Sequence, residues 1–159
     1  MQESDKLTNK KNYRVSNIKR IISLSFMTVI TYMIVGFCLA SLQINLGVWC
    51  VGILLYHYYI ASLETQKTHH LLDEYFQNKP LVTLISGLII SSISMLVYQT
   101  KPSLGMFQSI IIGLVAVINS WVMLKLTVQF WGNLKAVIFS TTMVWIGLLL
   151  GWVAQYYAT

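Results

Sequence analysis

The feature that most constrains this chain is a series of long apolar stretches that contain no charged residue in their interiors. Five are present, and their predicted bounds are 21–42, 44–63, 81–98, 104–124 and 134–157. A helix of about 20 apolar residues crosses the roughly 30 Å hydrocarbon core of a bilayer. One charge at the centre of such a helix costs roughly 2.5–3.5 kcal/mol. The interiors of all five stretches lack Asp, Glu, Lys and Arg, since Lys135 stands at the very start of the fifth, and this indicates membrane spans.

The composition excludes the main soluble classes. Only 10% of the 159 residues are charged and 56% are hydrophobic, whereas a soluble domain carries about 25% charged residues. The stretches are apolar on all sides, while the helices of a soluble bundle keep a polar face. We therefore predict an all-α integral membrane protein of about five transmembrane helices, with the lipid bilayer as its first partner.

The basic residues predict the organisation and the orientation. A basic cytoplasmic leader, residues 1–20, precedes a single transmembrane helical domain, residues 21–157. The first apolar stretch is longer than the core of a signal peptide and is followed at once by another, so we expect it to be retained. With the N-terminus inside, ten of the eleven basic residues are cytoplasmic and only Lys101 is outside. This distribution predicts N-in, C-out insertion, and we expect a bacterial inner membrane. The ten residues are Lys6, Lys10, Lys11, Arg14, Lys19, Arg20, Lys67, Lys79, Lys125 and Lys135.

The longest connection, between the second and third spans, carries an apolar stripe at helical spacing. It predicts a short amphipathic cytoplasmic helix over about Glu64–Asn78. The sequence Asn78-Lys79-Pro80 predicts a break before the third span, because Asn can cap a helix and Pro is tolerated in a first turn. The stripe consists of Leu71, Leu72, Tyr75 and Phe76.

The same connection holds the densest set of candidate metal ligands. On a helix, His69 with Asp73 and His70 with Glu74 are i, i+4 pairs, so each pair offers an imidazole and a carboxylate. The two pairs point in different directions, unlike motifs that place both histidines on one face. A solvated polar face explains the same residues, so we expect no metal site here.

His57 is the one histidine inside a predicted span. It is a weak candidate for an axial haem ligand, since a haem bundle usually supplies a second histidine from a facing helix and no other span has one. We favour an interfacial histidine among Tyr56, Tyr58 and Tyr59, and we expect no cofactor.

The two cysteines, Cys38 and Cys50, lie at similar depths on the first and second spans. A disulfide between them is geometrically conceivable. Both nevertheless lie in the apolar zone, where free cysteine is a common small buried residue, so we favour unpaired thiols.

Polar groups inside the spans are neutral, apart from His57 and the tyrosines. Transporters of ions and protons carry ionisable residues along their path, which disfavours a pump, a carrier or a voltage sensor. No paired carboxylates and no Ser-His-Asp arrangement are visible, so an intramembrane hydrolase has little support. Tyr32 and Trp145 fall near the middle of their spans, where we expect them to face other helices.

Small residues form faces that allow helices to approach closely. The fifth span contains a G-x-x-x-G motif, Gly147 to Gly151, and the third and fourth spans each have a small face. We favour packing among the chain's own helices over packing on another subunit. The third-span face is Gly87, Ser91 and Ser94, and the fourth-span face is Gly113, Ala116 and Ser120, with Asn119 close to it.

These observations favour a non-catalytic membrane subunit or accessory factor that assembles with other membrane proteins in a secretion, conjugation or respiratory complex. We expect no nucleic-acid partner. One alternative is an electron-transfer anchor that holds haem or quinone through His57. Another is an immunity or exclusion protein acting within the membrane.

Overall fold

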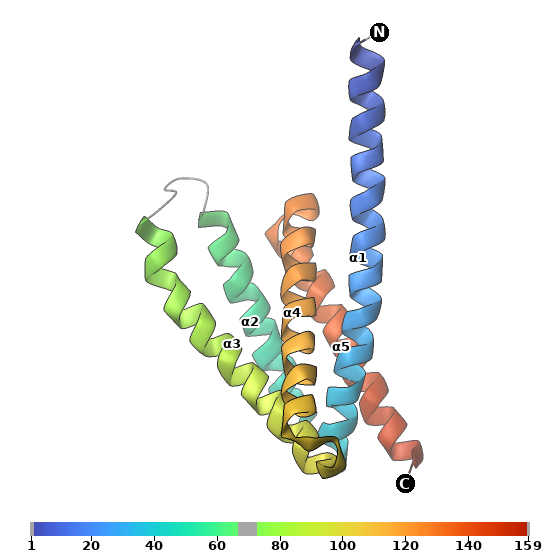
Figure 1. Ribbon diagram of the computed structural model, residues 1–159, viewed down its shortest axis with the longest axis vertical. Helices are drawn as coiled ribbons and strands as arrows, with labels where there is room; N and C mark the ends of the chain where they lie inside the picture. Colours follow the sequence, from blue (N-terminus) through green and yellow to red (C-terminus); the bar gives the residue numbers. More distant parts are fainter. Residues whose placement is uncertain (1, 67–72, 159) are drawn as a thin grey trace.

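The chain folds into five long helices that run alternately up and down (Figure 1). The computed structural model describes the backbone of residues 2–66 and 73–158, and the side chains of residues 15–63 and 81–158. In this described part, each of the five α-helices contains a segment long and apolar enough to cross a membrane. The prediction of an all-α chain with five such helices is therefore confirmed. The elements are α1 (Gln2–Ser41), α2 (Leu46–Gln66), α3 (Asp73–Thr100), the short 3-10 helix η1 (Pro102–Leu104), α4 (Gly105–Trp131) and α5 (Asn133–Ala158).

Helices α1, α3 and α4 are longer than the predicted spans. The basic leader and the first span form one continuous helix, α1, so no break in the backbone marks residue 20 (Figure 1). Helix α4 continues seven residues beyond its predicted end at 124 and includes Lys125. The turn before α5 reduces to Gly132, which has φ 78° and donates its N–H to the Val128 carbonyl. Only glycine adopts such a φ at low cost, which explains why α4 ends here.

The predicted amphipathic helix between the second and third spans is not a separate element in the described residues. Glu64–Gln66 ends α2, and Asp73–Asn78 begins α3, which continues through Pro80 without the predicted break. Proline removes one helical hydrogen bond, yet membrane helices tolerate this loss when neighbouring groups compensate for it. The stripe residues Leu71 and Leu72 lie outside the described residues.

The tight connection from α1 to α2 is built by two capping devices. Gln43 takes the left-handed conformation, φ 56°, its N–H bonds to Ala40, and the next N–H, of Ile44, bonds back to Leu39 at 2.9 Å. This is a Schellman motif with glutamine where glycine is usual. Asn45 then caps α2, because its side-chain oxygen accepts the Gly47 N–H at 2.8 Å. The hairpin is therefore a defined turn rather than an irregular re-entrant pair.

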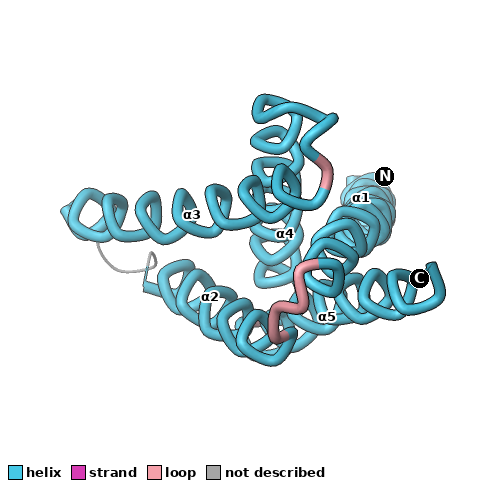
Figure 2. Tube along the Cα trace, turned by 90° about the horizontal axis from the view of Figure 1, so that it is seen from below, coloured by secondary structure: helices cyan, strands magenta, loops and turns pink. Residues whose placement is uncertain are grey.

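The helices are packed unevenly. Seen from below, α1, α4 and α5 group together while α2 and α3 extend to one side (Figure 2). The main buried cluster draws on all five helices and includes Leu39, Ile53, Ile93, Val117 and Leu148. Along α3, however, no residue from Leu81 to Ser92 is buried, and the buried ones begin at Ile93. The second half of α3 thus belongs to the main cluster. Over Leu81–Ser92 the helix contributes only partly buried residues, of which Val82, Ile85 and Ile89 pack against a second buried cluster.

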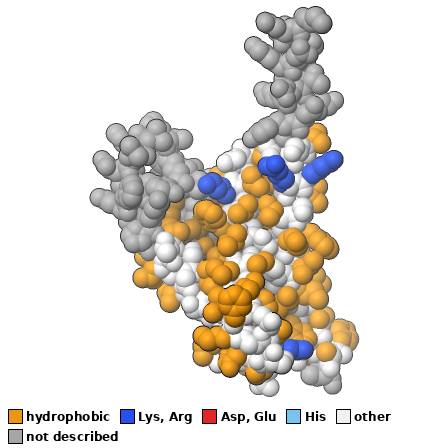
Figure 3. Space-filling view, in the orientation of Figure 1, with side chains coloured by type: hydrophobic (Ala, Val, Ile, Leu, Met, Phe, Trp, Pro, Cys, Tyr) orange, Lys and Arg blue, Asp and Glu red, His pale blue; other side chains and the backbone are white. Residues whose placement is uncertain are grey.

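The described basic residues gather at the two ends of the bundle. Alternating helix direction places Lys19, Lys125 and Lys135 at the end where α4 meets α5, and Lys101 at the opposite end. Blue side chains accordingly lie near both ends of the largely apolar surface in Figure 3. All five acidic residues lie outside the described side chains.

Candidate functional site

The closest helix contact in the molecule joins α1 to α5 through three glycines. A Cβ at Gly147 would lie 2.6 Å from the Val29 carbonyl oxygen, and a Cβ at Gly151 would overlap the Met33 carbonyl. Gly36 lies on the reciprocal side, where a Cβ would overlap the backbone of Leu148. The G-x-x-x-G motif of α5 is therefore occupied by the chain's own first helix, through backbone approach and dispersion.

The other predicted small faces are only partly used. A Cβ at Gly113 of α4 would lie 2.6 Å from the Ser94 hydroxyl of α3, so these two residues meet. Ala116 and Ser120 are buried as well, and Asn119 is half-buried. Gly87 and Ser91 are exposed instead, and nothing lies within 4 Å of a Cβ at Gly87. The structure thus separates this pair, which was predicted to pack inside the bundle, from Ser94.

His57 lies inside the helix bundle. Its side chain is 0% exposed, and its Nδ1 lies 3.0 Å from the hydroxyl of Thr141 on α5, within hydrogen-bond distance. The other ring nitrogen, Nε2, is also enclosed and has no hydrogen-bond partner. The sequence did not indicate that this side of α2, 100° from Tyr56, packs on α5, because the span is apolar all round.

Two further hydroxyl pairs join buried surfaces of the bundle. Tyr32 of α1 lies 3.5 Å from Ser120 of α4, and Thr127 of α4 lies 3.4 Å from Ser140 of α5. All four side chains are at most 2% exposed. Together with the His57 contact, these pairs connect α1, α2, α4 and α5 through polar side chains. Ser120 and Thr127 also donate to carbonyls of their own helix.

The surroundings of His57 favour a structural role. An axial haem ligand needs an imidazole nitrogen that faces open space, and neither nitrogen of this buried ring does. A catalytic Thr–His pair would need access for a substrate and a third group to orient the imidazole. His57 has no exposed surface, and no acidic side chain is among the described residues. The residues present therefore do not fit haem ligation in this packing.

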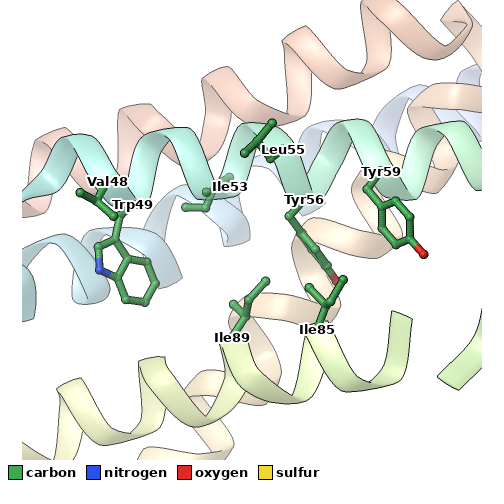
Figure 4. A pocket seen from close by; sticks show the side chains of 9 residues that line it. Val48, Trp49, Ile53, Leu55, Tyr56, Tyr59, Ile85 and Ile89 are labelled. Atoms are coloured by element: carbon green, nitrogen blue, oxygen red, sulfur yellow. The ribbon is translucent and has the colours of Figure 1, made fainter. Parts of the chain in front are cut away.

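An open hollow lies between α2 and α3, and we call it the α2–α3 groove (Figure 4). Its volume is about 450 Å³. Seven residues of α2 and two of α3 line it, and they are almost entirely apolar. They are Val48, Trp49, Gly52, Ile53, Leu55, Tyr56, Tyr59, Ile85 and Ile89.

One hydrogen bond spans this groove. The Tyr56 hydroxyl lies 2.9 Å from the Ser86 hydroxyl, so it links α2 directly to α3. In Figure 4 the Tyr56 ring points across the groove toward Ile85 and Ile89. Because both hydroxyls are satisfied by each other, the remaining lining offers an apolar surface with few free polar groups.

The remaining candidates give little chemistry. His69 and His70 lie outside the described residues, as do the side chains of Asp73 and Glu74. Among the described residues, no three His, Cys, Asp or Glu side chains gather as a metal site would require. Cys38 is buried, Cys50 is half-buried, and both are free thiols.

Sequence reasoning missed Gly36 and the α2–α3 groove. Gly36 was the one glycine of the first span and could have been matched to the G-x-x-x-G motif of the fifth, since close approach requires small residues on both helices. The groove had no comparable signal, because it depends on how far apart α2 and α3 lie.

Comparison of the chain with models of known protein families, with curated proteins and with solved structures finds no match in any of the three. Inference about function therefore rests on the geometry described above.

Proposed function

We propose that this chain is a non-catalytic multi-pass membrane protein that serves as an accessory or assembly subunit of a larger membrane complex. The observation that supports the proposal is that some helix surfaces are buried within the chain while others remain exposed. Neighbouring helices of the same chain pack closely against Gly36, Gly113, Gly147 and Gly151. Helix α3, by contrast, shows no buried residue from Leu81 to Ser92.

The exposed first half of α3 is the surface that we assign to a partner subunit. Gly87 and Ser91 lie one helical turn apart, and a Cβ at Gly87 would meet nothing. In membranes, helices associate through such small residues, because lipid offers no hydrophobic driving force for association. We infer that a helix of another membrane protein packs against this face.

The proposed orientation places the N-terminus in the cytoplasm. Four basic residues of the described part lie at one end of the bundle, namely Lys19, Arg20, Lys125 and Lys135, and Lys101 lies at the other. The positive-inside rule assigns the first end to the cytoplasm. A C-terminal alkaline phosphatase fusion should therefore be active, and an inactive fusion expressed at a normal level would reverse this orientation.

Purification in a mild detergent from the native host, followed by mass spectrometry, tests the subunit proposal. We expect stoichiometric membrane partners with the wild-type chain. The double variant Gly87→Leu with Ser91→Leu should lose them, because the new side chains prevent close approach while meeting nothing within the chain itself. The matched control, Val115→Leu with Ile118→Leu, changes two exposed positions of α4 and should keep the partners.

A wild-type chain that elutes alone would contradict the subunit proposal. The self-contained immunity protein would then take its place, and a protection assay on cells that express only this chain would test it. Equal loss of partners in both double variants would contradict the assignment of α3 as the partner surface.

A further inference from the structure

We propose that His57 makes the packing of α2 against α5 sensitive to acid, so that the two helices separate when the imidazole takes up a proton. The observation behind this inference is the Nε2 atom of His57. In the described part of the chain, it is the one fully enclosed side-chain nitrogen or oxygen that lacks a hydrogen-bond partner. The inference goes beyond the proposed function, because it concerns contacts within this chain and needs no partner subunit.

Three hydrogen-bonded contacts join α2 to α5, and we call them the α2–α5 seam. They follow in order along α2 and in reverse order along α5, as antiparallel helices require. Two of them end on backbone carbonyls of α2, which accept hydrogen bonds at every pH. The third uses an imidazole, the side chain whose charge ordinarily changes between about pH 5 and pH 8. The contacts are Cys50 with Trp145 at 3.1 Å, His57 with Thr141 at 3.0 Å, and Ala61 with Asn133 at 3.0 Å.

The closed seam accommodates a neutral imidazole and does not accommodate a charged one. A neutral ring carries one N–H and one lone pair, and Nδ1 uses one of these with the Thr141 hydroxyl, which can donate or accept. A charged ring carries an N–H on both nitrogens. In the seam the second N–H would lie at Nε2, where no acceptor is present. A buried charge without its hydrogen bonds is far more costly than a neutral group, so the closed seam excludes the proton.

No described side chain stabilises a positive charge at this place. The one described ring in contact with His57 is that of Tyr56, with the two centroids 6.0 Å apart, and its hydroxyl bonds to α3. The only charged side chains described on α4 and α5 are Lys125 and Lys135, which are themselves cations. Tyr32 of α1 faces α4 instead, and the described tyrosines of α3 and α5 lie at the end of the bundle that holds η1. A charge on the ring would therefore be uncompensated.

Protonation is therefore coupled to a movement of α2. Helix α5 is fixed by its glycine contacts with α1, so we assign the movement to α2. His57 lies about 9 Å along α2 from Leu63, the last residue of the apolar segment, and water enters from this end when the helices separate. Both N–H groups of the ring then bond to water. The closed seam contributes its full stability while the ring is neutral, and it loses stability as the pH falls below about 6.5, where a free imidazole takes up its proton.

Thiol labelling of the purified full chain in phospholipid nanodiscs tests this inference. Both native cysteines are replaced by alanine, and Ala61→Cys serves as the reporter, because Ala61 is 2% exposed and lies one turn from His57 in the seam. A water-soluble thiol reagent is applied at about pH 8 and at about pH 5. Leu134→Cys, at a position that is 70% exposed, corrects for the reagent's own dependence on pH. The ratio of labelling at Ala61→Cys to that at Leu134→Cys should rise severalfold at the lower pH, and an unchanged ratio would overturn the proposal.

Histidine variants provide the matched comparison. His57→Gln keeps a hydrogen-bonding side chain but takes up no proton in this range, so its ratio should stay low at both pH values. His57→Leu replaces it if the seam of His57→Gln is labelled already at the higher pH. The double variant His69→Gln with His70→Gln removes the other two histidines of the chain and should keep the rise. A rise that persists without His57, or that disappears in the double variant, would contradict the assignment. If Ala61→Cys does not elute as a single folded species, Ala136→Cys is the reporter, since Ala136 is 0% exposed in the same buried cluster.

Discussion

Glycines have opposite consequences at the α1–α5 interface and at the α2–α3 groove. At the first, Gly36, Gly147 and Gly151 remove side chains so that two backbones touch. At the second, Gly52 also removes a side chain, but no backbone moves into the space and a hollow remains. A glycine in a membrane helix therefore indicates close approach only where the facing helix is near enough to use it.

This difference separates the region that stabilises the fold from the surfaces that are available for another function. The α1–α5 contact joins the first and last helices of the chain, so it closes the bundle. The α3 face around Gly87 and Ser91 is exposed instead, whereas the groove residues Ile53 and Tyr56 belong to the buried clusters. Substitutions should therefore have large effects on stability at the α1–α5 contact and small effects at this α3 face.

The largest loss of stability is expected from Gly151→Ala. Its new methyl group would overlap the Met33 carbonyl, so α5 must move away from α1. Overpacking of this kind costs about 1–3 kcal/mol and sometimes more, and we expect the upper end because backbone atoms cannot rotate aside. Thermal unfolding in detergent should show a lower midpoint. An unchanged midpoint would mean that the two helices are not in contact at this position.

The sequence predicted the number and approximate bounds of the helices because lipid selects strongly for length and for the absence of charge. It placed Tyr32 and Trp145 toward other helices, and in the structure Tyr32 faces Ser120 while the Trp145 indole donates to the Cys50 carbonyl at 3.1 Å. These inferences depended only on how far each residue lies from the ends of its span, and the sequence gives that position directly.

Which side of each helix faces which neighbour could not be predicted in the same way. The helices are apolar all round, so no periodicity marks the buried side, and nothing in the sequence indicated that His57 lies against Thr141 of α5. Gly87 and Gly147 resemble each other in sequence, yet only the second meets another backbone. The candidate groove depends on the spacing of α2 and α3, which no local pattern encodes.

Thr141→Val tests the side of α2 that packs against α5. The substitution keeps the shape and removes the only hydrogen bond that the structure gives the buried His57 ring. Interhelical bonds in membranes average about 0.6 kcal/mol, but an unsatisfied buried group costs about 1–3 kcal/mol, so we expect about 1 kcal/mol of destabilisation by thermal unfolding. The double variant with His57→Leu should recover part of this loss. Additive losses would show that the two side chains do not interact.

Gly87→Ala should leave the stability unchanged or raise it slightly, rather than lower it. No heavy atom lies within 4 Å of the new Cβ, and alanine is favoured over glycine in a helix by about 0.8–1.0 kcal/mol. The purified chain should therefore unfold at an equal or slightly higher temperature, in contrast to Gly151→Ala, which makes the same chemical change. A clear decrease would mean that α3 packs more closely along its first half than the described contacts show.

The smallest effect is expected from Tyr56→Phe, which removes the one hydrogen bond across the groove. Tyr56 and His57 are adjacent on α2, and each bonds to a different helix. Tyr56→Phe therefore tests the side of α2 that faces α3, as Thr141→Val tests the side that faces α5. Ser86 is half-buried, and a hydroxyl on a membrane helix can turn to a carbonyl of its own helix one turn back. We therefore expect about 0.5 kcal/mol or less of destabilisation by thermal unfolding. A large loss of stability would instead show that this single bond, rather than the buried packing of Ile93, Leu96 and Val97, holds α3 to the bundle.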